Sequence, residues 1–128
     1  MTKTPWPRKR TREHIDRLAS DHGIAITWVR DWFDAESYPD TKIVFIPKPS
    51  CIFHYLVALH EFGHILDKDS RRLRKSSPYS MSSVLACEGH AWGWAMDHAI
   101  PEARPRASGD EKVWQGVARS FASHLIYP

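Results

Sequence analysis

Apolar residues recur along the first part of the chain at the spacing of an amphipathic helix. Within residues 11–22, Ile15, Leu18 and Ala19 fall on one face, and Gly23 follows where a helix of that length would end. We therefore predict a first helix over residues 11–22.

Two short apolar runs follow, and both contain several β-branched residues. Residues 24–29 have the sequence IAITWV, and residues 42–46 have the sequence KIVFI and are followed closely by two prolines. Runs of this length and composition are typical of strands. Between them, residues 30–40 are acidic and aromatic and end in the turn-forming sequence YPD. The pattern predicts two strands joined by a long turn.

The second half of the chain is predicted to be helical. Residues 51–67 carry apolar residues at helical spacing, with Ser50 as the expected N-cap. A polar, basic stretch at residues 68–80 interrupts this pattern and is predicted to be a loop. Residues 81–100 then form a second strongly apolar helix, and residues 110–126 form a last amphipathic one. The expected order is one helix, two strands and three helices.

Length and composition place the chain among ordinary globular domains. It has 128 residues, of which 42% are hydrophobic and 26% charged, and this excludes collagen-like and disordered proteins. Its longest mainly apolar stretch, residues 51–59, is about half of the roughly 20 residues that a membrane span needs, and the first residues lack the apolar core of a signal peptide. We expect a single, mainly helical α+β domain over residues 11–128, located in the cytoplasm, with no membrane partner.

The net charge of +3 is unevenly distributed. Five basic residues and no acidic ones occur among the first twelve residues, whereas the remainder carries 13 basic against 15 acidic residues. Residues 1–10 also contain two prolines, so we expect a flexible basic arm that could bind the phosphates of a nucleic acid. The two cysteines, Cys51 and Cys87, form no CxxC pair and are expected to be reduced thiols.

The helix predicted at residues 51–67 contains an HExxH motif, in which His60, Glu61 and His64 are the defining residues. Because residues i and i+4 share one face of a helix, about 6 Å apart, the two imidazoles can bind one divalent ion. Zinc there would lower the pKa of a coordinated water to about 7, and Glu61 could pass the proton of that water to a leaving amine. The motif predicts amide hydrolysis. The competing interpretation is that both histidines are buried helix residues bonded to backbone or carboxylate groups.

A catalytic zinc normally has three protein ligands, and Glu88 is the leading candidate for the third. It is the single carboxylate on an otherwise apolar face of the helix at residues 81–100, where an unpaired charge would be costly. A zinc ion held by His60 and His64 would neutralise it. The alternative partner is an arginine such as Arg119.

Other polar residues are weaker candidates. Three convergent ligands from one straight helix are geometrically unfavourable, so Asp67 is expected to hydrogen-bond the free ring nitrogen of a ligand or to lie in solvent. Asp67, His90 and His98 are alternative third ligands. His90 and Cys87 are weaker candidates, because they fall more to the side of their helix away from Glu88. His98, His90 or Tyr79 could donate a hydrogen bond to the oxyanion that forms during hydrolysis.

The HEFGH motif is followed after 23 residues by Glu88, Ala91 and Trp92 in an E-x-x-A-W pattern. This arrangement resembles the gluzincins, the zincin metallopeptidases in which a glutamate is the third zinc ligand. More narrowly, the stretches LHEFGHIL and CEGHAW are similar to the ImmA/IrrE-like peptidases of bacteria, phages and mobile elements. The resemblance covers residues 11–100 and implies a zincin-like domain in which a short two- to three-stranded sheet packs on the HExxH helix.

The resemblance also implies roles for individual residues. One Zn²⁺ would be bound by the two histidines and Glu88, with Glu61 as the base. The strand that contains Ile43, Val44 and Phe45 would form the rim of the cleft, where an extended protein or peptide substrate adds as a further strand.

Three functions are compatible with these features. The first is a zinc metallopeptidase. The second is a non-catalytic module, stabilised by a metal or associated with nucleic acid, that uses the basic arm. The third is a helical interaction domain without a metal. Glu61 favours the enzyme, because a purely structural metal site needs no base.

Overall fold

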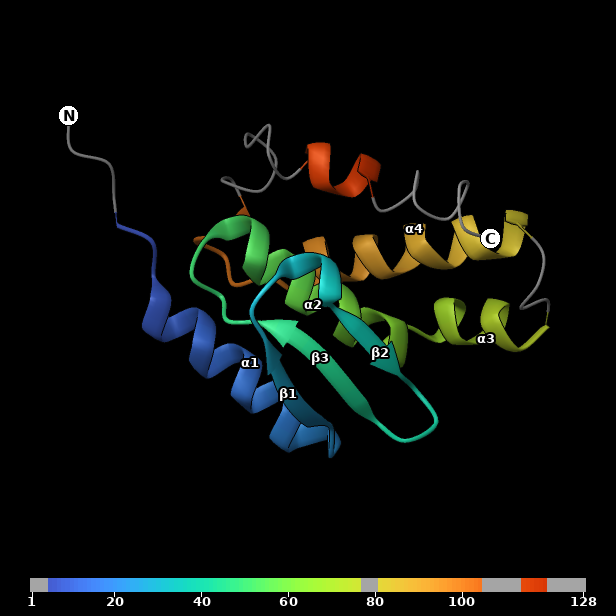
Figure 1. Cartoon of the computed structure of the whole chain (residues 1–128), viewed down its shortest axis with the longest axis horizontal. Helices are drawn as coiled ribbons and strands as arrows, with labels where there is room; N and C mark the ends of the chain where they lie inside the picture. Colours follow the sequence, from blue (N-terminus) through green and yellow to red (C-terminus); the bar gives the residue numbers. More distant parts are fainter. Residues whose placement is uncertain (1–4, 77–80, 105–113, 120–128) are drawn as a thin grey trace.

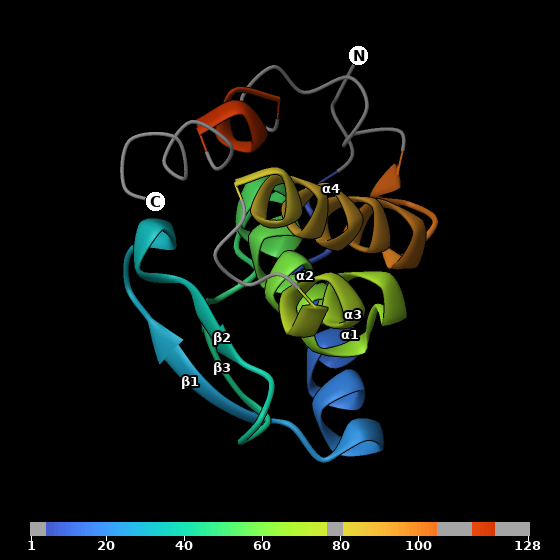
Figure 2. The ribbon, with the colours of Figure 1, turned by 90° about the vertical axis from the view of Figure 1, so that its right-hand side faces the viewer.

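A three-stranded sheet lies against a layer of helices in the computed structural model of the chain (Figures 1 and 2). The structure describes residues 5–76, 81–104 and 114–119. The predicted class, a small and mainly helical α+β domain, is confirmed. No helix in the described ranges is long and apolar enough to cross a membrane.

Helix α1 (Arg8–His22) begins three residues earlier than predicted. It buries Thr11 and Ile15, and Gly23 ends it in the left-handed conformation, with φ of 65°. Just before the helix, the indole Nε1 of Trp6 donates a hydrogen bond of 2.9 Å to the backbone oxygen of Pro49. The expectation of a flexible arm is therefore wrong for residues 5–10, which are helical or bonded to the domain.

The sheet contains β1 (Ala25–Val29), β2 (Glu36–Tyr38) and β3 (Ile43–Pro47) in the order β1-β3-β2. Strand β3 is parallel to β1 and antiparallel to β2. The two predicted strands are confirmed as β1 and β3. Strand β2 and the 3-10 helix η1 (Trp32–Asp34) were not predicted, and both lie within the expected long turn.

This strand order corrects the expected substrate rim. Ile43, Val44 and Phe45 lie on β3, which is the central strand and is hydrogen-bonded on both sides. A substrate therefore cannot add to β3. Of the two edge strands, β2 makes the more extensive contact with α2 (Ile52–Leu66), the helix that carries the HExxH motif.

Helix α2 is the centre of the hydrophobic core. It lies between the sheet and α4 (Met81–His98), and its residues Tyr55, Leu56, Leu59 and Phe62 are completely buried (Figure 2). The N-cap residue is Cys51 rather than the predicted Ser50, and it makes no side-chain capping bond. The helix is instead stabilised by the burial of its apolar side chains.

Of the two helices that follow α2, one was predicted and the other was not. Helix α3 (Lys68–Ser76) occupies a stretch that was expected to be a loop, so that prediction is wrong. Helix α4 confirms the apolar helix predicted over residues 81–100. Of the last predicted helix, residues 114–119 are helical, and the rest lies outside the described residues.

Helices α2 and α4 approach closely because Gly63 has no side chain. A Cβ atom at this position would lie 2.7 Å from the backbone oxygen of Ala91 on α4. Ala91 and Ala95 are themselves small and completely buried. The close packing brings the polar residues of the two helices within bonding distance of one another.

Candidate metal centre

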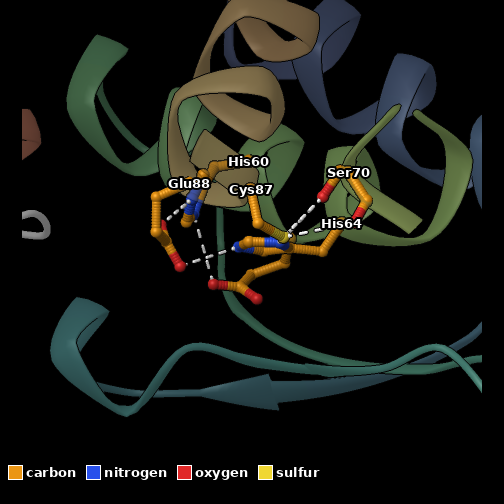
Figure 3. Close-up of polar contacts among 6 residues, drawn as sticks. His60, His64, Ser70, Cys87 and Glu88 are labelled. Atoms are coloured by element: carbon orange, nitrogen blue, oxygen red, sulfur yellow. Dashed lines mark hydrogen bonds and ion pairs between the residues drawn. The ribbon is translucent and has the colours of Figure 1, made fainter. Parts of the chain in front are cut away.

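Helix α2 presents two histidines and a glutamate to one side, and α4 presents a second glutamate to the same place (Figure 3). We call these four residues, His60, Glu61, His64 and Glu88, the buried cluster. Each is between 5% and 7% exposed. Polar groups so far from solvent need partners within the protein.

The carboxylate of Glu88 bridges the two imidazoles. Its Oε2 lies 2.7 Å from the Nε2 of His60, and its Oε1 lies 3.1 Å from the Nε2 of His64. Glu61 lies at the opposite nitrogen of His60, with its Oε1 3.3 Å from Nδ1. The two ligands expected from the HExxH motif, the expected third ligand and the expected base thus meet in space. Arg119, the alternative partner of Glu88, is exposed.

The groups of the buried cluster change one another's protonation. Burial raises the pKa of Glu88, but hydrogen bonds with His60 and His64 outweigh it and hold that pKa well below its ordinary value. Burial lowers the pKa of His64, but its bonds with Cys87 and Glu88 raise it to about 10. The pKa of His60 is raised in the same way by Glu61 and Glu88, against the effect of burial. The cluster therefore pairs a negative carboxylate with positive charge.

The buried cluster offers imidazole nitrogens and carboxylate oxygens, which are the kinds of ligand that zinc binds. Two ligand atoms on one tetrahedral zinc lie about 3.3 Å apart, since each bond is about 2.0 to 2.1 Å long. The two Nε2–carboxylate distances of Glu88, 2.7 and 3.1 Å, are close to that separation. An ion bound by both imidazoles and the carboxylate would replace the charge of the imidazole protons.

Each imidazole is held by further residues. The indole of Trp92 stacks on the ring of His60, with centroids 4.1 Å apart and planes inclined by 16°. At His64, the Nδ1 atom lies 3.4 Å from the Oγ of Ser70 and 3.6 Å from the Sγ of Cys87. Burial raises the pKa of the Cys87 thiol, but the bonds with His64 and Ser70 outweigh it and lower that pKa.

Ser70 was not among the predicted site residues, and Cys87 was predicted on the wrong side of its helix. Cys87 was expected to point more to the other side of its helix, whereas it is buried beside His64. Asp67 was expected to bond a ring nitrogen or to lie in solvent; it is partly exposed, and its Oδ1 accepts a hydrogen bond of 2.8 Å from the backbone N–H of Ser70. The signal that could have identified Ser70 is the spacing Asp67-x-x-Ser70, which is typical of a helix N-terminus.

The alternative third ligands lie elsewhere. Ligand atoms of Asp67, Asp69 and His90 come within 4.8 Å of one another, and we call these three residues the surface group. His98 donates from Nδ1 to the backbone oxygen of Trp94, at 2.9 Å, and stacks on that residue. Tyr79 lies outside the described residues. Within the part of the chain that the structure describes, Glu88 is the carboxylate that bridges both HExxH histidines.

Comparisons of the chain with known protein families, with curated proteins and with solved structures found no match. We therefore infer the function from the chemistry of the buried cluster.

Proposed function

We propose that this protein is a zinc-dependent metallopeptidase of the gluzincin type, similar to the ImmA/IrrE-like peptidases, that hydrolyses peptide bonds of a protein substrate in the cytoplasm. The observation that supports it is the bridge that Glu88 makes between the two HExxH histidines, in a buried place with Glu61 beside it. A structural zinc site needs ligands only. Glu61 adds the general base that hydrolysis needs.

Each residue of the buried cluster has a role in this proposal. His60, His64 and Glu88 would hold the metal. When bound, zinc would lower the pKa of its water to about 7 and polarise the carbonyl of the scissile bond. Glu61 accepts a proton from the attacking water as the new C–O bond forms. It then donates that proton to the nitrogen of the leaving amine as the C–N bond breaks.

The edge of the sheet offers a place for an extended substrate. Strand β2 is bonded to β3 on one side, and no strand among the described residues pairs with its other edge. The carboxylate of Glu88 points towards the strands that run beneath the buried cluster (Figure 3). A peptide that pairs with β2 through its backbone would bring a peptide bond under the metal ligands. We therefore place the substrate at β2 rather than at the predicted residues of β3.

Zinc content and the variant Glu61→Gln test the proposal together. Elemental analysis of the purified protein should find about one zinc per chain. Glu61→Gln should keep the zinc, but its cleavage of a peptide library, followed by mass spectrometry, should fall by about 100-fold or more. Glu13→Gln, at an exposed position on α1, is the matched control and should cleave like the wild type.

Two results would count against the proposal. Cleavage that survives in Glu61→Gln would remove Glu61 from the mechanism. A folded wild-type protein that binds no zinc would make the buried cluster a structural ion-pair network and would favour a non-catalytic interaction domain.

A further inference from the structure

The Nδ1 side of His64 faces a small polar network that the proposed reaction does not use (Figure 3). The Oγ of Ser70 and the Sγ of Cys87 both approach Nδ1, and these two atoms are 2.9 Å apart. Ser70 is completely buried and Cys87 is 7% exposed. The network joins three helices, because His64 comes from α2, Ser70 from α3 and Cys87 from α4.

A backbone carbonyl fixes the direction of the hydrogen bonds in this network. The Sγ of Cys87 lies 3.4 Å from the backbone oxygen of Ser70, which can only accept, so the thiol is the donor. The sulfur then accepts from the hydroxyl of Ser70, and the hydroxyl oxygen accepts from the Nδ1–H of His64. In this arrangement each of the three side chains donates one hydrogen bond, so no buried donor is left unpaired.

We propose that Ser70 and Cys87 are positioning residues that orient the ring of His64 and keep a hydrogen on its Nδ1. The Nε2 atom is then always the nitrogen that faces Glu88, 3.1 Å away, and the metal. The consequence for metal binding rests on the proposed function. The hydrogen-bond network itself belongs to the chain and can be tested without a metal.

Charge gives a reason for a neutral network at this position. The second ring nitrogen of a metal-bound histidine commonly donates to a carboxylate, a backbone carbonyl or water. Here Glu61 and Glu88 already provide two carboxylates, which equal the charge of one Zn²⁺. A third carboxylate in the same buried place would be uncompensated. A hydroxyl and a thiol hold the ring without adding charge.

Zinc affinity, measured by competition with a chelator, tests the proposal with matched variants. Cys87→Ala and Ser70→Ala should each weaken zinc binding by about 10- to 100-fold, as is typical when the outer partner of a ligand is lost. Cys51→Ala and Ser20→Ala remove the same groups at positions away from the cluster and should bind zinc like the wild type. Cys87→Ser and Ser70→Thr keep a donor and an acceptor and should restore most of the affinity. Their recovery would separate hydrogen bonding from a general loss of folding.

Nitrogen-15 NMR of the imidazole of His64 gives a direct second measurement. The wild type, with or without zinc, should show a slowly exchanging hydrogen on Nδ1, and this hydrogen should exchange faster in both alanine variants. A bare Nδ1 in the wild type, or alanine variants with unchanged exchange and unchanged zinc affinity, would overturn the proposal. A wild type that binds no zinc but shows the protected Nδ1 hydrogen would contradict the proposed function and still support the positioning role.

Discussion

The buried cluster and the surface group contain the same kinds of residue and differ in their surroundings. In each, ligand atoms of three residues lie within 4.8 Å of one another, and these residues are His60, Glu61 and His64 in the buried cluster and all three members of the surface group. The surface group is open to solvent, with Asp69 and His90 exposed. Its acids also have local partners, since Asp67 bonds the backbone N–H of Ser70 and Asp69 pairs with Arg72 at 3.3 Å.

The difference shows that proximity alone is weak support for a metal site. A solvated carboxylate costs little, so the surface group needs no ion to explain it. In the buried cluster the charge of Glu88 must be compensated within the protein, and its partners in the described part of the chain include the two HExxH histidines. We therefore expect removal of a cluster residue to have large effects and removal of its surface counterpart to have small ones.

The largest effect is expected for Glu88→Ala. In the metal-free protein this change should lower the free energy of unfolding by about 3 kcal/mol, the lower end for a broken buried pair, because the imidazoles can release their protons. The control is Glu102→Ala. Glu102 makes a contact with Arg10 as short as that of Glu88 with His60, 2.7 Å, but an exposed one. Denaturant unfolding should show a loss of less than about 1 kcal/mol for the control. Equal losses of unfolding free energy in the two variants would show that the buried pair contributes no more than the exposed one.

Zinc binding should also distinguish the buried cluster from the surface group. His64→Ala should weaken zinc binding by more than about 100-fold, since loss of a direct ligand exceeds the loss of an outer partner. His90→Ala should leave about one zinc per chain. Isothermal titration of the metal-free proteins with zinc measures both. A zinc ion that disappears with His90 rather than with His64 would transfer the metal centre to the surface group.

The buried, apolar elements could be predicted from the sequence, whereas the short and the polar ones could not. Helices α2 and α4 follow from apolar periodicity, and the isolated charge of Glu88 on an apolar face indicated that it meets the HExxH histidines. The position of β2 could not be read in this way, because three residues are too few to show a period of two. Because β2 was not predicted, β3 was expected to be an edge strand, whereas pairing with β2 makes it the central strand.

Helix α3 and the network at His64 were missed for a related reason. The sequence KDSRRLRKS has one apolar residue, Leu73, so hydrophobic spacing gives no helical signal. The helix is instead begun by Asp67, which accepts from the N–H of Ser70. Because Ser70 belongs to an element that was not predicted, its approach to His64 could not be foreseen, and neither could the contact of Cys87.

The close approach of α2 and α4 is tested by Gly63→Ala against Gly93→Ala. At Gly63 the added methyl group would meet the carbonyl oxygen of Ala91, which should cost about 1 to 3 kcal/mol and separate the two halves of the buried cluster. At Gly93, on the exposed side of α4, an added Cβ would meet no atom of the described residues within 4 Å beyond the local backbone, and alanine should stabilise by up to about 1 kcal/mol. Thermal unfolding should therefore shift in opposite directions. A stabilising Gly63→Ala with unchanged zinc affinity would show that the helices need not pack so closely.

The smallest effect is expected for Asp67, which links the surface group to the buried cluster. Asp67→Ala removes the capping bond at the start of α3 and should cost about 1 kcal/mol, seen in denaturant unfolding. Zinc affinity should fall less than in Ser70→Ala, because Asp67 acts only by placing Ser70. Asp69→Ala, which breaks an exposed pair with Arg72, should change neither quantity. If Asp67→Ala weakened zinc binding more than Ser70→Ala, Asp67 would have to contact the metal or its ligands directly, and the surface group would be part of the metal site.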